Sequence, residues 1–360
     1  MMQVRGFFRS LDIGLILLVV MLMMVSMLAL YSASGQDTAM VLRQLMRYGL
    51  GFAVVLLIAR MPPRILYAWA PYLYFLGLVL LILVAVAGEI RLGARRWLDL
   101  GFMSFQPSEI MKLALPMFLA RYYSQESARN TKSVLIGLLL MGLPFVLVLK
   151  QPDLGTASLI AAAGFFVLWL AGVPFVWFAG LGTLLLASAP VLWHFLHEYQ
   201  RQRILTLLDP QADPLGSGYH IIQSMIAIGS GGVMGKGWLQ GTQARLDFIP
   251  ESHTDFIFAV FAEEFGLAGE IVLLSLYLLV IGRGLIIAFE NKDPFARILS
   301  GALSLTLFVY VFANMGMVSG ILPVVGVPLP FISYGGTSMI TLMATFGILM
   351  SVHAHRRINA

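Results

Sequence analysis

The sequence predicts an all-α polytopic membrane protein with about ten transmembrane helices and a large outer segment between the seventh and eighth. Of its 360 residues, 59% are hydrophobic and 11% are charged, whereas a soluble domain carries roughly 25% charged residues. Ten apolar runs are suited to crossing a hydrocarbon core of about 30 Å. They fall near 11–31, 41–59, 65–87, 107–122, 134–149, 154–171, 173–190, 266–289, 297–319 and 336–353. We therefore expect one integral membrane domain over 1–360.

The composition excludes several classes of protein. The chain has no cysteine, which rules out disulfides and thiolate metal sites. Its net charge of +5 is spread thinly without a basic run, so no nucleic-acid partner is expected. The first apolar run, which follows Arg5 and Arg9, is longer than the roughly 7–15 residues of a signal-peptide core. We interpret it as a retained helix.

The placement of lysine and arginine predicts that both termini are cytoplasmic, as the positive-inside rule requires. The inner loops then hold Arg5, Arg9, Arg60, Arg64, Arg121, Arg129, Lys132, Lys292, Arg297, Arg356 and Arg357. A second group of cations lies near outer helix ends, namely Arg43, Arg47, Arg91, Arg95, Arg96, Lys150, Arg201 and Arg203. Snorkelling toward headgroups explains any one of these. Together they indicate an anionic ligand, such as a pyrophosphate or carboxylates.

Residues 191–265 form the large outer segment, which we expect to be an extracytoplasmic loop with short helices. Its most informative stretch is 250–256, where Glu251, Ser252, His253, Thr254 and Asp255 precede an apolar run. Ionisable groups at a membrane boundary are costly, so they indicate a functional site.

Three helix starts on the outer side share one design: 106–109, 151–156 and 250–255 each combine a proline with an acidic residue. Proline suits the first turn of a helix because its missing N–H has no partner there. An acidic residue interacts favourably with the helix dipole at the same place. Capping needs only one carboxylate per helix, and it does not explain why three such starts gather beside surplus cations. A cavity for a charged headgroup explains both observations.

The spacing alone leaves the role of each candidate open. Asp255 either forms a capping box with Ser252 or acts as a general base. Glu109 and Lys112, at i and i+3, either neutralise each other or contact a substrate. Asp153 either caps its helix or lines the cavity.

The charge state of Asp255 is also open at this stage. Burial and Glu251 would raise its pKa, and a helix start and a protonated His253 would lower it. His253 either is a capping or solvated group or hydrogen-bonds Asp255 or a substrate. Glu263 and Glu264 are expected to face solvent or headgroups. No spacing matches a strong metal motif, although a carboxylate-bound Mg²⁺ or Mn²⁺ on a pyrophosphate is compatible with the sequence.

Five stretches, in this order, resemble the SEDS family (shape, elongation, division and sporulation), which are bacterial peptidoglycan glycosyltransferases. They are 93–98 with 106–109 and Lys112, then 151–156, 250–258, Pro323, and 328–338. The stretch 235–243 resembles the form found in the elongation members rather than the division members.

The resemblance implies that lipid II is polymerised on the outer face of the bacterial cytoplasmic membrane during elongation and rod-shape maintenance. A growing glycan on undecaprenyl pyrophosphate would be the donor, and the transfer would invert C1. Asp255 matches the presumed catalytic residue. Glu109, Lys112 and Asp153 match positions that line the central cavity.

Further contacts to substrate are expected from Arg47, Arg95, Arg96, His253 and Glu251. The resemblance also implies a class B penicillin-binding protein and the elongation machinery as partners. No cofactor is evident from the sequence. The main alternative is a transporter that flips lipid II across the membrane, since broken helices and intramembrane charges suit it equally well. A scaffold without chemistry is the third alternative.

Overall fold

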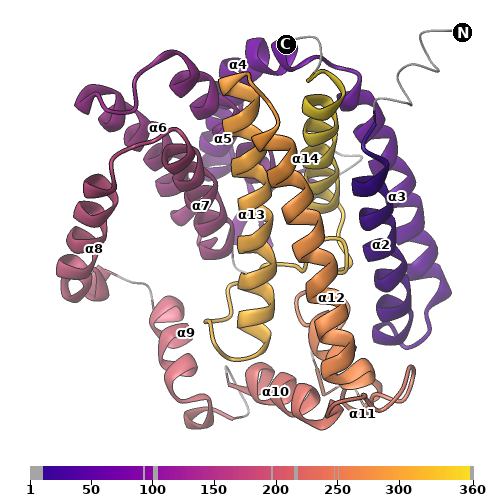
Figure 1. The fold of residues 1–360 in the computed structure, drawn as a ribbon. Coiled ribbons are helices and arrows are strands. Elements are labelled where there is room, and N and C mark those ends of the chain that lie inside the picture. Colours follow the sequence, from indigo (N-terminus) through magenta and orange to yellow (C-terminus); the bar gives the residue numbers. More distant parts are fainter. Residues whose placement is uncertain are drawn as a thin grey trace, which may run out of the picture.

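The computed structural model describes residues 11–91, 94–99, 104–195, 198–214, 218–246, 248–249 and 251–356. Within them, ten long helices form a bundle (Figure 1). These are α2 (Ile13–Ala33), α3 (Thr38–Ala59), α4 (Pro63–Ala87), α5 (Pro107–Gln125), α6 (Thr131–Leu149), α7 (Leu154–Leu170), α8 (Phe175–Phe195), α12 (Ile257–Phe289), α13 (Pro294–Val318) and α14 (Thr337–Ala354). Each apolar run predicted to span the membrane coincides with one of these helices and extends at most two residues beyond it. The predicted fold class is confirmed.

The smaller elements lie between the long helices. The short helices α9 (Glu198–Leu208), α10 (Tyr219–Gly231) and α11 (Thr242–Arg245), with the 3₁₀ turn η1 (Pro210–Ala212), connect α8 to α12. A three-stranded antiparallel sheet, β1 (Glu89–Arg91), β2 (Ala94–Asp99) and β3 (Ser104–Phe105), connects α4 to α5. Seven helices among the described residues are long and apolar enough to cross a membrane, and α7 and the apolar part of α8 are shorter.

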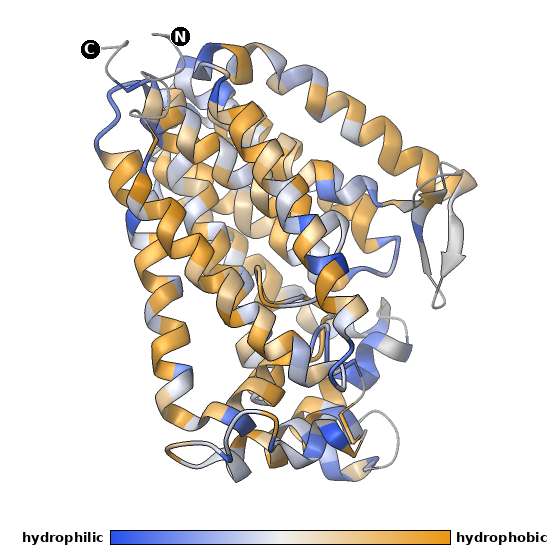
Figure 2. Cartoon of the chain, turned by 90° about the vertical axis from the view of Figure 1, so that its right-hand side faces the viewer, coloured by the Kyte–Doolittle hydropathy of each residue, from blue (hydrophilic) through white to orange (hydrophobic). Residues whose placement is uncertain are grey.

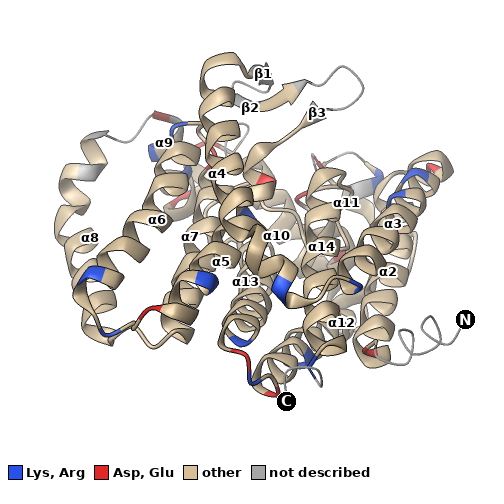
Figure 3. Cartoon of the chain, turned by 90° about the horizontal axis from the view of Figure 1, so that it is seen from above, with Lys and Arg blue, Asp and Glu red and all other residues tan. Residues whose placement is uncertain are grey.

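The bundle has the polarity of a membrane protein. Hydrophobic residues follow the long helices, and hydrophilic residues gather at helix ends and on the short helices (Figure 2). Viewed from above, charged residues are sparse among uncharged ones (Figure 3). α2 begins and α14 ends at the same end of the bundle, opposite α10 and α11 (Figure 1).

Polar side chains start many of the long helices. Asp12, Asp37, Asn130, Asp153 and Asp293 stand at the N-caps of α2, α3, α6, α7 and α13, and each accepts a hydrogen bond from a backbone N–H of the first turn. Those N–H groups have no partner within the helix, so the caps satisfy them where lipid cannot. At the core, α13 packs against α12, α7 and α5, and α14 packs against α3.

α12 is broken at Gly266, whose φ of 60° and ψ of −167° are not helical. The loop after α10 fills the break: Leu267 and Ala268 donate their N–H groups to the carbonyls of Gly232 and Val233. A side chain at Gly266 would overlap the backbone nitrogen of Gly235. The span predicted from 266 onward is therefore preceded by two extra turns, Ile257 to Phe265, of the same element.

The expectation that Glu263 and Glu264 face solvent or headgroups is wrong, since both are fully buried beside this break. Glu263 Oε1 accepts hydrogen bonds from Lys236 Nζ at 2.6 Å and from the N–H of Thr242 at 2.8 Å. Glu264 accepts one from the hydroxyl of Ser32. The two carboxylates therefore hold the loop 236–243 against α12 and α2.

Candidate functional site

The segment 251–256 forms a tight turn that ends at the start of α12. Phe256 is the N-cap of α12, and no side chain caps this helix. The hydroxyl of Ser252 donates to the carbonyl of Ala33 at 3.1 Å, so the capping box with Asp255 does not form. Asp255 is thus not needed to satisfy the helix, and its carboxylate is available for another role.

The backbone on either side of Asp255 is fixed by groups distant in sequence. Asn314, fully buried on α13, donates from Nδ2 to the carbonyl of Asp255 at 2.8 Å and to that of Val327 at 2.7 Å. The hydroxyl of Ser333 donates to the carbonyl of Thr254 at 2.7 Å. Tyr334 donates its N–H to the carbonyl of His253 at 2.9 Å. α13 and the loop before α14 therefore hold the turn in place.

The carboxyl group of Asp255 is in an unusual electrostatic environment. Burial raises its pKa from 3.8 to about 6, and the Glu251 carboxylate adds to the rise. The Arg203 guanidinium lowers the pKa of Asp255, and the Asp153 carboxylate raises it further. These three groups come from the turn itself, from α9 and from the start of α7. Of the opposing influences that the sequence left open, burial and Glu251 outweigh the cation and raise the pKa.

Asp153 has the capping role that the sequence offered as one alternative. Its Oδ1 accepts from the N–H of Thr156 at 3.1 Å. Its Oδ2 accepts from Gln106 Nε2 at 3.1 Å and lies 3.9 Å from Arg96 NH1. Asp153 therefore links the starts of α5 and α7 while it interacts with Asp255.

Glu109 and Lys112 form the ion pair that their spacing predicted, with Lys112 Nζ 2.7 Å from Glu109 Oε1. Both residues are about 95% buried on α5, and the ammonium also lies 5.2 Å from the ring of Tyr310. The second oxygen of Glu109, Oε2, is buried and has no hydrogen-bond partner. A buried charge with a free acceptor costs free energy unless a ligand supplies a donor, so Oε2 is available to accept a hydrogen bond from a ligand.

Arg47 and His253 meet at Tyr334. The Arg47 guanidinium lies 4.2 Å from the centre of the Tyr334 ring and donates to the carbonyl of Gly335 at 3.3 Å. The His253 ring is 6.1 Å from the same tyrosine ring. Arg47, on α3, is thereby brought to the turn that carries Asp255.

Arg96 points toward the start of α7, where it donates to the carbonyls of Gln151 and Pro152. The side chain of Arg95 lies outside the described residues. The sequence did not single out Arg203, Asn314, Tyr310 or Tyr334 as site residues. The cluster of outer cations contained Arg203 and the motif 328–338 contained Tyr334, but nothing in the pattern marked Asn314 or Tyr310.

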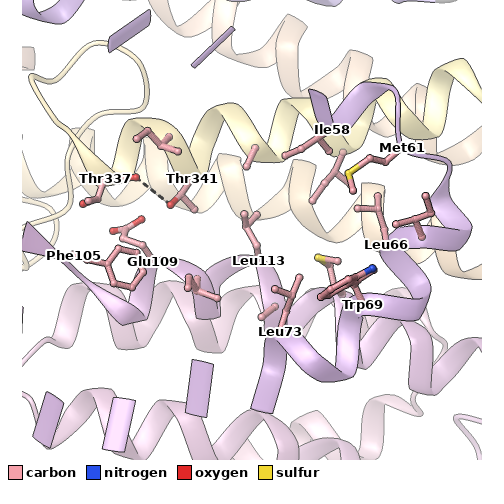
Figure 4. Close-up of a pocket in the computed structure, with 17 residues that line it drawn as sticks. Ile58, Met61, Leu66, Trp69, Leu73, Phe105, Glu109, Leu113, Thr337 and Thr341 are labelled. Atoms are coloured by element: carbon pink, nitrogen blue, oxygen red, sulfur yellow. Dashed lines mark hydrogen bonds between the residues drawn. The ribbon is translucent and has the colours of Figure 1, made fainter. Parts of the chain in front are cut away.

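An apolar groove of about 570 Å³ runs between α4, α5 and α14 (Figure 4). Glu109 and Thr337 stand at one end, beside Phe105, and Met61 and Trp69 stand at the other. Along α14 it extends from Thr337 to Ile348, eleven steps or about 17 Å at 1.5 Å per residue. The groove thus follows the helices through about half of a hydrocarbon core and ends at a buried carboxylate.

Within the described part of the chain, no three His, Asp or Glu side chains lie close enough together to hold a metal ion by themselves. Asp255, Glu251 and Asp153 do interact electrostatically. Carboxylates with phosphate oxygens are the ligands that Mg²⁺ usually takes, so these residues fit a cation only as part of a shared site with a phosphorylated ligand.

A family model described as a cell cycle protein, FTSW_RODA_SPOVE, matches residues 6–358. The peptidoglycan glycosyltransferase MrdB of Escherichia coli (strain K12) is 53% identical over 352 residues, which cover 96% of this chain and 94% of that protein. Stage V sporulation protein E of Bacillus subtilis (strain 168) is 32% identical over 366 residues, covering 96% and 98%.

Two solved structures have the same fold. A chain from a peptidoglycan synthase complex, described by its structural coordination of polymerization and crosslinking, aligns with a TM-score of 0.85 at 36% identity, covering 96% of this chain and 98% of that one. The rod shape determining protein RodA of Thermus thermophilus aligns with a TM-score of 0.72 at 30% identity, covering 96% and 97%. The resemblance inferred from the motifs is confirmed, and the chain belongs to the FtsW/RodA/SpoVE family of cell cycle proteins.

Proposed function

We propose that this protein is a peptidoglycan glycosyltransferase that polymerises lipid II into glycan strands on the outer face of the bacterial cytoplasmic membrane, in cell elongation and rod-shape maintenance. The observation that carries the proposal is Asp255, a buried carboxylate with a pKa raised to about 6, whose backbone carbonyl is held by Asn314. A general base works best when its pKa is near the working pH. The name and the high identity of MrdB support the same reaction.

In the proposed reaction the carboxylate of Asp255 accepts the proton of the acceptor 4-hydroxyl as that oxygen attacks C1 of the donor sugar. The new C–O bond forms while the bond from C1 to the pyrophosphate oxygen breaks, so C1 is inverted. The electron pair leaves on the undecaprenyl pyrophosphate. Arg203, close enough to act on the charge of Asp255, would stabilise the negative charge of that leaving group. A divalent cation would reduce the same charge.

The other candidates have supporting roles in this proposal. The apolar groove ending at Glu109 takes an isoprenoid chain, and the free Oε2 of Glu109 accepts a hydrogen bond from the headgroup. Arg47 and Arg96 each have a backbone carbonyl partner and would reach substrate with their remaining donors. Glu251 and His253 lie in the turn beside Asp255 and contact the sugars.

The proposed orientation places both termini in the cytoplasm and the segment 191–265 outside. We propose a class B penicillin-binding protein as the partner that cross-links the product, within the elongation machinery. The support is the related chain that forms part of a peptidoglycan synthase complex.

The test separates polymerisation from transport of lipid II. The purified protein, with its penicillin-binding partner, is reconstituted into vesicles that carry fluorescent lipid II in both leaflets. We expect glycan polymer on gels, and transfer of lipid II between leaflets no faster than in protein-free vesicles. Rapid transfer without polymer would mean that the protein is a flippase. The absence of both polymer and transfer would favour the scaffold.

A further inference from the structure

A second cavity lies on the outer loops, apart from the apolar groove. It has a volume of about 640 Å³, within the roughly 300–1,000 Å³ of typical ligand sites. Its walls come from the end of α2, the α2–α3 loop, the turn 251–253 and three residues before that turn, Leu239, Arg245 and Ile249. Ser34, Gln36 and Arg245 contribute a hydroxyl, an amide and a guanidinium to it, and Glu251 and His253 a carboxylate and an imidazole. This lining suits a polar, uncharged ligand better than an acyl chain.

The backbone around the cavity is strained. Gln36, Leu239 and Glu251 have φ values of 70°, 64° and 53°, and all three line it. They are three of the five described non-glycine residues with positive φ. Such residues cost about 1–3 kcal/mol each and concentrate at functional sites.

The cavity walls are anchored to the bundle rather than loosely placed. The hydroxyl of Ser252 joins the turn to the carbonyl of Ala33. Trp238 Nε1 donates to the carbonyl of Leu28 at 3.1 Å, and Glu263 binds the first residues of α11. The cavity is therefore preorganised, which reduces the entropic cost of binding.

The turn 251–255 separates this cavity from the rest of the candidate site. Glu251, Ser252 and His253 line the cavity, whereas Asp255 does not. The partners of Asp255 on its other side come from α7 and α9, and α2, α3 and α11 lie across the bundle from them (Figure 1). A polymer chain reacting at Asp255 would thus find a polar pocket next to the reacting residue, away from the lipid groove.

We infer that this cavity is a subsite for the glycan strand already made, where it holds N-acetylated amino sugars adjacent to the reacting end. The inference rests on the proposed function. An acceptor lipid II has a single disaccharide tied to the membrane, whereas a growing strand must extend outward from the site. The hydroxyl and acetamido groups of such sugars match the donors and acceptors of Ser34, Gln36 and Arg245.

The first test measures binding without catalysis. The probe is the β-1,4-linked tetramer of N-acetylglucosamine, titrated into the detergent-purified protein and followed by saturation-transfer NMR. The double variant Gln36→Asn/Arg245→Ala shortens the amide, in a residue type that tolerates positive φ, and removes the cation. We expect its affinity for the tetramer to fall about tenfold or more, as expected for lost hydrogen bonds to a charged group. Arg129→Ala, an exposed residue in the loop between α5 and α6, is the control and should bind as wild type does. Equal affinity in all three proteins would overturn the inference.

The second test follows the length of the product. If lipid II is polymerised, the double variant should release strands of less than half the wild-type mean length, whereas Arg129→Ala should not. If the double variant made strands of wild-type length but no longer bound the penicillin-binding partner, the cavity would instead be the binding site of that partner. Failure of the wild type to polymerise would refute the proposed function, whereas the tetramer titration decides on the cavity independently.

Discussion

Replacing Asp255 by asparagine should make the protein more stable at neutral pH while it removes the base. The pKa of this carboxyl rises from 3.8 to about 6 on folding, and each unit corresponds to about 1.36 kcal/mol. Ionising Asp255 in the folded protein therefore costs up to about 3 kcal/mol more than in the unfolded chain. Asparagine keeps the size of the side chain and has no charge to bury.

The direction of the pKa shift determines the pH range in which the variant is more stable than wild type. Because the folded-state pKa is the higher one, the stability that a protonated Asp255 contributes is fully present below pH 3.8 and is lost as the pH rises through about 6. The variant should therefore exceed wild type by up to about 3 kcal/mol at pH 8, and by little near pH 4.

The assay is reversible unfolding of wild type, Asp255→Asn and a control, Glu126→Gln, by sodium dodecyl sulfate at pH 4.5, 6 and 8. Glu126 is an exposed carboxylate at the end of α5, so its variant should show no such trend. If Asp255→Asn raised the free energy of unfolding equally at all three pH values, or lowered it at pH 8, the reasoning would be refuted. Burial of the ionised carboxylate would then not destabilise the folded protein.

Three further outcomes follow from the contacts. Asn314→Leu leaves the buried carbonyls of Asp255 and Val327 without a donor, so lipid II polymerisation should fall about tenfold or more and its pH profile should shift; an unchanged rate and profile would contradict the positioning role. Glu109→Gln with Lys112→Ala should restore folding relative to Lys112→Ala alone, but polymerisation should stay low. Recovery of activity in the double variant would mean that the two residues only neutralise each other. Leu113→Trp should narrow the apolar groove and raise KM for lipid II several-fold with less effect on kcat. A lower kcat with an unchanged KM would argue against a lipid in the groove.

Much of the fold could be predicted because the membrane restricts it. Lipid supplies no hydrogen bonds, so each apolar run had to be a helix, and the ten runs gave ten helices. The ion pair of Glu109 and Lys112 and the cap at Asp153 depend on residues three apart in one helix. Local spacing was enough to propose these contacts.

The remaining features depend on contacts between distant parts of the chain. The burial of Glu263 is stabilised by Lys236, 27 positions earlier, and Asn314 reaches Asp255 from 59 positions away. A pattern of apolar runs does not contain these pairings. The break at Gly266 likewise depends on a loop that supplies its missing backbone partners.

The most direct test of the central claim is the Asp255→Ala variant, purified with its penicillin-binding partner and given lipid II. A base held in a turn that needs no helix cap should be removable without loss of the fold. We expect no glycan polymer, with the elution volume and partner binding of wild type, while Glu126→Ala polymerises normally. Polymer at wild-type levels from Asp255→Ala would contradict the assignment of Asp255 as the catalytic base.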